Sequence, residues 1–133
     1  MRRLLPLAIL AAALLSGCGA KGVTSPAPET VVGTLPKPAA VPDTPASKLK
    51  GDATAGKAIF TSAGCVSCHT LAAAKSTGTV GPNLDQAKPD FKLATARVTL
   101  GKGVMPSFKG QLSDQEIANV AAFVVTSTGG TVP

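Results

Sequence analysis

The sequence predicts an all-α domain in residues 49–133 of the 133-residue chain. Three observations support this fold class. Helix start and stop signals frame three segments of this region, apolar residues recur at helical spacing in the last segment, and no segment shows sustained alternation of apolar and polar residues. Aromatic residues make up only 3% of the chain, so alanine, valine and leucine must fill the core.

The first seventeen residues have the three parts of an export signal peptide. Two arginines precede an apolar run, residues 4–15, and the small residues Ser16 and Gly17 follow it. A membrane-spanning helix needs about 20 apolar residues, and this run is shorter. We therefore expect residues 1–17 to be removed on export.

Cys18 stands directly after these small residues, in the sequence Leu15-Ser16-Gly17-Cys18. This run resembles the lipobox of bacterial lipoproteins, in which the cysteine becomes the lipidated first residue of the mature chain. The resemblance implies a lipid anchor on Cys18. Two or more acyl chains would hold the protein on a bilayer, because each buried CH₂ contributes about 0.8 kcal/mol. A plain secretory signal with a chance cysteine at its end is the alternative.

Residues 18–48 are expected to form a disordered, proline-rich linker. Residues 19–48 contain six prolines and show no helical or alternating apolar pattern. Proline removes backbone donors and favours an extended conformation, which suits a spacer. The predicted organisation is therefore a signal peptide in residues 1–17, a lipidated linker in residues 18–48, and one domain in residues 49–133.

The first predicted helix begins after Asp52, a suitable N-cap, and continues from Ala53 to about Ser62. Gly56 lies in its middle, where glycine costs about 1 kcal/mol relative to alanine, so we expect another helix to approach closely there. The residues expected on its buried side are Ala55, Ile59 and Phe60.

Two further helices are predicted from their caps. The second helix extends from Pro89 or Asp90 to Leu100 and stops at Gly101. The third helix begins at a capping box in residues 113–116 and ends before the glycine pair at 129–130. The residues expected on the buried sides are Phe91, Ala94 and Val98 in the second helix, and Ile117, Val120, Ala121, Val124 and Val125 in the third.

The chain carries a formal net charge of +6, from 13 lysine and arginine residues against 7 aspartate and glutamate residues. The lysines are scattered along the domain and no aromatic residues are interleaved with them, which argues against nucleic-acid binding. A mildly basic surface favours association with an acidic partner, and it equally serves to keep a small protein in solution.

The segment Cys65-Val66-Ser67-Cys68-His69 has the pattern by which c-type haem is attached. Two thiols three positions apart can each add to one haem vinyl group, and the adjacent histidine is thereby brought to one face of the iron. We therefore predict one covalently bound haem c, held by Cys65 and Cys68, with His69 as the proximal iron ligand.

Three other interpretations of this motif fit the sequence less well. A thioredoxin-like redox pair should follow a strand in a βαβ pattern, and no such pattern is present. A structural zinc site needs four ligands, and no second pair follows. A disulfide between Cys65 and Cys68 closes so small a loop that it would stabilise little.

The segment from Asp52 to Thr128 resembles a class I cytochrome c of the small bacterial kind. The matching motifs are Gly56-Lys57-Ala58-Ile59-Phe60, Cys65 to His69, Gly81-Pro82-Asn83-Leu84, Gly103-Val104-Met105-Pro106 and the capped last helix. The resemblance implies a small cytochrome c fold of three to five helices packed around one haem. It also implies that Gly56 and Phe60 meet the last helix near Phe123.

The same resemblance implies the remaining contacts of the haem. Met105, the only methionine after the initiator, would supply the distal thioether sulfur, and the Pro82 carbonyl would accept a hydrogen bond from the second ring nitrogen of His69. Ordinary core packing of Met105 and iron ligation by Lys102 or Lys109 remain alternatives. Many family members carry a tyrosine or tryptophan near the haem propionates, and this chain has neither. Arg97 or one of the lysines could serve in their place, and the sequence does not say which.

A histidine and methionine pair saturates iron in both oxidation states, which favours transfer of single electrons over catalysis. We expect a monomeric cytochrome, lipid-anchored on the periplasmic side or outer face of the cell membrane, that carries electrons between membrane redox complexes. One alternative is a five-coordinate haem module that binds a gas or has peroxidase-like activity, which requires that Met105 not bind iron. Another is a haem-free lipoprotein interaction domain.

Overall fold

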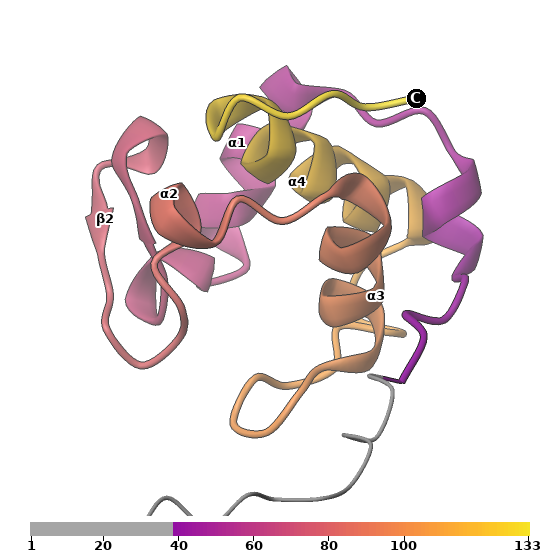
Figure 1. Cartoon of the computed structure of the whole chain (residues 1–133), viewed down its shortest axis with the longest axis horizontal. Helices are drawn as coiled ribbons and strands as arrows, with labels where there is room; N and C mark the ends of the chain where they lie inside the picture. Colours follow the sequence, from indigo (N-terminus) through magenta and orange to yellow (C-terminus); the bar gives the residue numbers. More distant parts are fainter. Residues whose placement is uncertain (1–38) are drawn as a thin grey trace, which may run out of the picture. The chain divides into compact units, whose positions relative to one another are not determined.

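The computed structural model describes residues 39–133, whose regular structure is mainly helical (Figure 1). The elements in chain order, with η denoting a 3-10 helix, are η1 (Pro45–Lys48), α1 (Ala53–Ser62), η2 (Cys65–Ser67), β1 (Thr70–Leu71), η3 (Ala72–Ala74), β2 (Ser76–Thr77), α2 (Leu84–Ala87), α3 (Phe91–Leu100) and α4 (Asp114–Ser127). The all-α prediction is confirmed except for β1 and β2, two residues each, which pair antiparallel. No helix within residues 39–133 is both long and apolar enough to cross a bilayer.

The helix α4 lies between α1 and α3 and contacts both (Figure 1). At the crossing of α1 and α4, Gly56 is buried, and a Cβ atom there would collide with the carbonyl oxygen of Asn119. One turn further along α1, the rings of Phe60 and Phe123 meet edge to face with centroids 5.6 Å apart. The close approach expected at Gly56 is therefore confirmed.

The start of α1 follows the prediction, but part of its buried side does not. The Asp52 carboxylate accepts hydrogen bonds from two backbone N–H groups of the first turn. Phe60 is buried and Ile59 half-buried, whereas Ala55 is exposed. The prediction for Ala55 is wrong, because the buried side is centred on Gly56 and Phe60, and successive residues of a helix are turned by about 100°.

The helix α3 ends where it was predicted to end, and it begins at Phe91, one residue after the predicted Asp90, which is its N-cap. The Asp90 carboxylate accepts a hydrogen bond from the Leu93 N–H at 2.7 Å, and the helix ends at Gly101. Phe91 and Ala94 are buried as expected, while Val98 is half-buried at the edge of a cavity.

Two threonines of α3 are buried although their polarity did not suggest it. The Thr95 hydroxyl donates to the Phe91 carbonyl at 2.9 Å, and the Thr99 hydroxyl donates to the Thr95 carbonyl at 2.7 Å. Since each hydroxyl is satisfied inside its own helix, the side chain can pack in the core without an unpaired polar atom.

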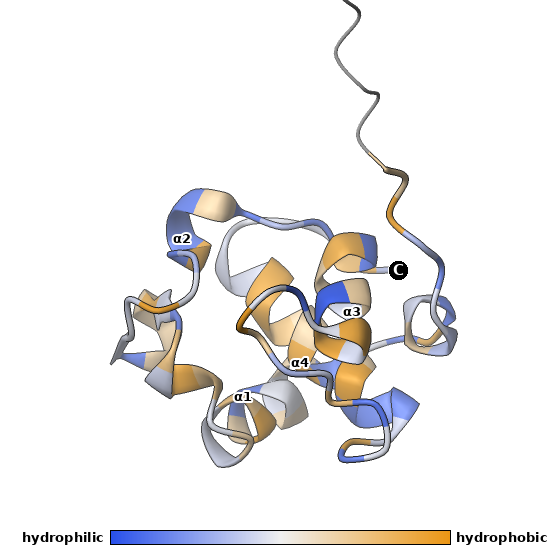
Figure 2. Cartoon of the chain, turned by 90° about the horizontal axis from the view of Figure 1, so that it is seen from below, coloured by the Kyte–Doolittle hydropathy of each residue, from blue (hydrophilic) through white to orange (hydrophobic). Residues whose placement is uncertain are grey.

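The helix α4 supplies most of the core. Its capping box is present, because the Ser113 N–H donates to the Glu116 carboxylate at 2.8 Å and the Glu116 N–H donates to the Ser113 hydroxyl at 3.3 Å. All of the residues predicted on its buried side are buried, namely Ile117, Val120, Ala121, Val124 and Val125. One core cluster joins α4 to α3 and η1, and a second joins it to α1. Figure 2 shows that α1, α3 and α4 all carry hydrophobic residues.

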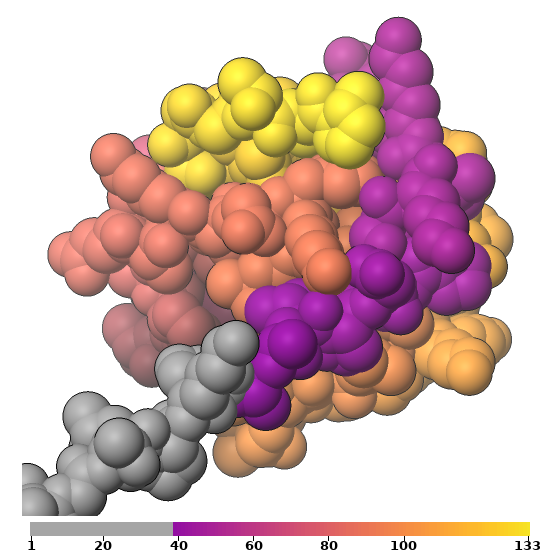
Figure 3. Space-filling view, turned by 45° about the vertical axis from the view of Figure 1, so that its right-hand side comes forward, coloured from indigo at the N-terminus to yellow at the C-terminus, as the bar shows by residue number. Residues whose placement is uncertain are grey.

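The packed domain begins earlier than the sequence suggested. Residues 43–48, assigned to the linker, form η1 and its cap and pack against α3 and α4 (Figure 3). Ala46 is fully buried in the core, Thr44 is buried as the N-cap of η1, and Asp43 forms an ion pair of 2.7 Å with Lys92. The linker prediction is wrong for these residues. The predicted signal peptide, Cys18 and the linker up to residue 38 lie outside the described residues.

Candidate functional site

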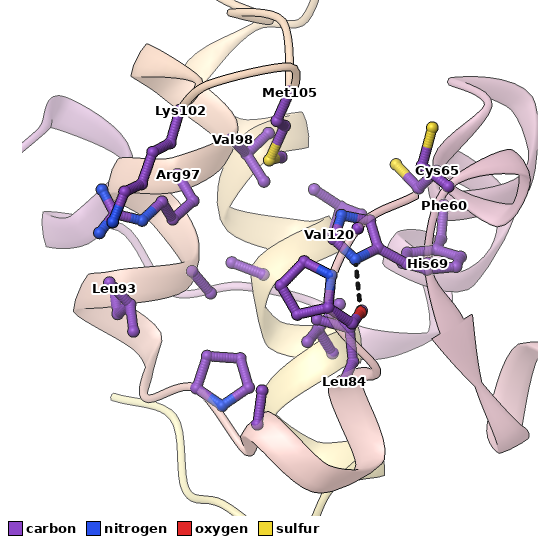
Figure 4. A pocket seen from close by; sticks show the side chains of 18 of the residues that line it. Phe60, Cys65, His69, Leu84, Leu93, Arg97, Val98, Lys102, Met105 and Val120 are labelled. Carbon is purple, nitrogen blue, oxygen red and sulfur yellow. Dashed lines mark hydrogen bonds between the residues drawn. The ribbon is translucent and has the colours of Figure 1, made fainter. Parts of the chain in front are cut away.

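A cavity of about 550 Å³ opens between the wall formed by α1 and α4, the helix α3, and two loops, residues 80–84 and 101–105 (Figure 4). This volume is within the range of roughly 300–1,000 Å³ that is usual for cofactor sites. Its lining is mainly aliphatic and includes Leu93, Val98, Val120 and Val124. No carboxylate of residues 39–133 lines it.

Cys65 and Cys68 lie at one edge of the cavity as free thiols. Gly64, in the left-handed conformation with φ +80°, ends the turn after α1 and leads the chain into η2. The His69 N–H then donates to the Cys65 carbonyl at 3.0 Å, so the three motif residues are folded around one tight turn. The pKa of the Cys65 thiol is raised above its ordinary value, mainly because the side chain is buried.

The alternative zinc interpretation has no support among residues 39–133. This part of the chain contains no group of three or more histidine, cysteine, aspartate or glutamate side chains arranged to hold a metal ion. Within this part of the chain, Cys65 and Cys68 therefore lack the set of further ligands that a closed tetrahedral site needs.

The His69 ring is fixed by a hydrogen bond and by a glycine. Its Nδ1 lies 2.9 Å from the Pro82 carbonyl oxygen, which is the contact that the family resemblance implied. A carbonyl oxygen only accepts, so Nδ1 carries the hydrogen and Nε2 keeps a lone pair with which to bind a metal. A Cβ atom on Gly81 would lie 2.6 Å from Cε1 of this ring, so only glycine leaves room for it.

Met105 enters the cavity from the loop that follows α3. Figure 4 shows its side chain directed into the cavity and the His69 ring facing it from the other side. The loop is closed by reciprocal backbone hydrogen bonds between Lys102 and Met105, of 3.1 and 3.0 Å. Lys102 also lines the cavity, whereas Lys109 does not.

Two cationic side chains, Arg97 and Lys102, line the cavity on the side away from Cys65 (Figure 4). Within residues 39–133 the only ion pair joins Lys92 to Asp43, so neither cation has a carboxylate partner there. The sequence offered Arg97 as one candidate among many and did not place it. The sequence carries no local signal for Arg97, because tertiary packing decides which residues of α3 line the cavity.

These residues fit a haem group. The thiols of Cys65 and Cys68 lie at one edge, a ring nitrogen and a thioether sulfur face each other across the cavity, and aliphatic side chains form the walls. At the other side, two cations that form no ion pair within residues 39–133 suit the two carboxylates of the haem. The arrangement therefore accounts for each chemically distinct part of this cofactor.

The comparisons with known proteins agree with this geometry. Residues 51–124 match the family described as "Cytochrome C oxidase, cbb3-type, subunit III". The chain is 41% identical over 78 residues to cytochrome c6 of Leptolyngbya boryana, covering 56% of this chain and 91% of the relative. It is 36% identical over 84 residues to cytochrome c6 of Diacronema lutheri, covering 59% of this chain and 100% of that relative.

A solved structure shows the same fold. The c-type cytochrome SorU from Sinorhizobium meliloti superposes with a TM-score of 0.55 and is 43% identical, over 59% of this chain and 92% of SorU. The family match covers more than half of the chain, and the two cytochrome c6 relatives named above are covered over 91% and 100% of their length. The chain therefore belongs to the cytochrome c family, as a small class I c-type cytochrome that carries covalently bound haem c and transfers electrons.

Proposed function

We propose that this cytochrome is a membrane-tethered carrier of single electrons in which His69 and Met105 close both faces of the haem iron. The observation that carries the proposal is the opposition of these two side chains across one aliphatic cavity. Bound haem supplies the iron that takes up and gives back one electron. His69 and Met105 would supply the same nitrogen and sulfur ligands in either oxidation state, so little rearrangement of the protein would oppose the transfer.

The other residues of the site hold and orient this group. Cys65 and Cys68 would each form a thioether at a former vinyl group. The Pro82 carbonyl accepts the Nδ1 hydrogen of His69, which fixes the ring and makes its other nitrogen more basic. Arg97 and Lys102 would pair with the propionate carboxylates, in place of the tyrosine or tryptophan found in many relatives.

The rim of the cavity supplies a docking surface for a redox partner. Val80 and Val104 line the cavity and are nevertheless 66% and 81% exposed, which is uncommon for valine. A weak, partly apolar contact suits short encounters with a redox protein, because little area must separate afterwards.

The tether is proposed from the sequence of residues 1–38. Lipidation of Cys18 would hold the mature chain on the extracytoplasmic face of a membrane. The proline-rich segment that follows would let the domain reach more than one membrane complex, and a tethered carrier keeps a high effective concentration near its partners.

The ligand pair is tested by adding carbon monoxide to the reduced holoprotein and to its Met105→Ala variant. The wild-type visible spectrum should stay unchanged on the time scale in which the variant converts to its carbonyl complex. A wild-type protein that binds carbon monoxide as fast as Met105→Ala would contradict the proposal and favour the five-coordinate haem module.

The tether is tested separately by the Cys18→Ser variant. Wild-type protein should remain with the membrane fraction after a high-salt wash, and Cys18→Ser should be released while keeping its haem spectrum. Equal distribution of the two proteins between the membrane and soluble fractions would contradict lipid anchoring at Cys18.

A further inference from the structure

The chain that follows Met105 returns at once to the C-terminal end of α3. The Ser107 hydroxyl donates to the Thr99 carbonyl at 2.6 Å, and the Phe108 N–H donates to the Val98 carbonyl at 3.0 Å. The last four carbonyls of a helix have no partner within it. Two of these four are therefore satisfied by residues that stand two and three positions after Met105.

Ser107 makes two more hydrogen bonds besides this one. Its hydroxyl oxygen accepts from the Lys109 N–H at 3.2 Å, and its carbonyl accepts from the Gln111 side-chain amide at 2.7 Å. Its own side chain is exposed, so these contacts are not a consequence of core packing. They fix the conformation of the segment that leads away from Met105.

The other end of the loop is attached to the same helix. The Gly101 N–H donates to the Arg97 carbonyl at 2.8 Å. Gly101 has φ +73°, and a Cβ atom on it would lie 2.9 Å from the Ser107 nitrogen. The segment that enters the loop and the segment that leaves it are therefore in direct contact. The loop is thus closed at its base by contacts between Gly101, Ser107 and the end of α3.

Apolar packing within the loop contributes little to holding Met105. Val104 and Pro106, on either side of it, are exposed. The position of its sulfur therefore depends on the hydrogen bonds at the base of the loop, because no neighbouring apolar side chain of the loop is buried to hold it.

We propose that Ser107 is a positioning residue for the distal ligand: its hydroxyl, bonded to the Thr99 carbonyl, holds the loop against α3 and so sets how readily the Met105 sulfur leaves the iron. This inference rests on the proposed ligation of iron by Met105. When the Ser107 bond opens, one of the contacts that hold the base of the loop against α3 is lost, so the sulfur would withdraw more readily.

The test compares the rate at which reduced holoproteins bind carbon monoxide. The variants are Ser107→Ala, which removes the hydroxyl, and Ser107→Thr, which keeps it. The matched control is Thr126→Ala in α4, because the Thr126 hydroxyl also donates to a helix carbonyl, that of Ala122 at 2.8 Å, but does not line the cavity. The unfolding midpoint of each holoprotein in guanidinium is measured alongside.

We expect Ser107→Ala to bind carbon monoxide about tenfold faster than wild type, because a hydroxyl hydrogen bond typically shifts such an equilibrium by about this factor. Ser107→Thr should bind carbon monoxide as slowly as wild type. Thr126→Ala should also bind it as slowly as wild type, although its unfolding midpoint should be comparable to that of Ser107→Ala. A rate for Ser107→Ala equal to that of wild type, or an equal acceleration in Thr126→Ala, would overturn the role of Ser107.

These outcomes are distinct from a failure of the ligand assignment. If Met105 does not bind iron, wild type already binds carbon monoxide as fast as Met105→Ala. If Met105 binds iron and Ser107 is only a structural residue, wild type and Ser107→Ala bind it equally slowly, and Met105→Ala alone is fast.

Discussion

Gly56 in α1 packs directly against the main chain of Asn119 in α4, at the point where the two helices cross. A Cβ atom at this position would also lie 2.9 Å from Cβ of Phe123. The contact matters for the site, since α1 leads into Cys65 and α4 forms the wall of the cavity. The distance between the thiols and that wall therefore depends on the absence of a side chain at residue 56.

The Gly56→Ala variant should be less stable than wild type by about 2 kcal/mol, because the added methyl group forces the helices apart. The better helix propensity of alanine offsets only about 1 kcal/mol of the steric cost. Guanidinium unfolding of the holoprotein measures the difference. Lys57→Ala, on the exposed side of the same helix, is the control and should stay within about 0.5 kcal/mol of wild type. A stabilised Gly56→Ala would show that the helices do not cross as described.

The helices could be predicted well from the sequence because their termini carry local signals. Asp52, Asp90 and Ser113 each accept a backbone hydrogen bond in the first turn, and such N-caps act within three or four residues. The error at Ala55 came from a different source. In a short helix rich in alanine, the apolar pattern alone does not say which side faces the core.

The start of the domain could not be predicted for a physical reason. Ala46 and Thr44 are buried by contacts with α3 and α4, more than 40 residues later in the sequence, and a proline-rich segment gives no local sign of such packing. In the site, Cys65, Cys68 and His69 form one local motif that is visible in sequence. Arg97 came to the cavity through tertiary packing, which spacing in the sequence does not reveal.

The Ala46→Asn variant tests whether residues 43–48 belong to the folded domain. Ala46 is fully buried, so a larger polar side chain there should lower the free energy of unfolding by about 2 kcal/mol. The control is Lys48→Asn, since Lys48 is exposed in the same 3-10 helix, and it should stay close to wild type. Equal unfolding midpoints for the two variants would mean that this segment behaves as linker after all. Guanidinium unfolding is again the measurement.

The Arg97→Gln variant tests the proposed pairing with the haem carboxylates. A cation near the haem favours the reduced state, so its loss should lower the reduction potential by on the order of 50 mV, equivalent to about 1 kcal/mol. Arg97→Lys should have a reduction potential close to that of wild type, because lysine keeps the positive charge. Lys92→Gln is the control on the same helix, since Lys92 pairs with Asp43 and does not line the cavity. If Arg97→Gln and Lys92→Gln shifted the potential equally, Arg97 would have no special relation to the haem.

The capping box of α4 should make stability depend on pH in a definite direction. Hydrogen bonds from the N–H and hydroxyl of Ser113 hold the pKa of the Glu116 carboxyl below its ordinary value of 4.5. The folded state therefore binds this proton less readily than the unfolded state. The contribution of Glu116 is fully present above about pH 4.5 and is lost as the pH falls through the lowered pKa.

The Glu116→Gln variant isolates this contribution, because glutamine keeps an acceptor oxygen but does not titrate. The difference in unfolding free energy between wild type and Glu116→Gln should be constant from about pH 6 to 8 and should shrink below about pH 4.5. In a Ser113→Ala background the hydroxyl that donates to Glu116 is missing. The difference in unfolding free energy caused by Glu116→Gln should therefore shrink less at low pH. Urea unfolding at a series of pH values measures both differences, and a difference that is independent of pH in the wild-type background would refute a lowered pKa for Glu116.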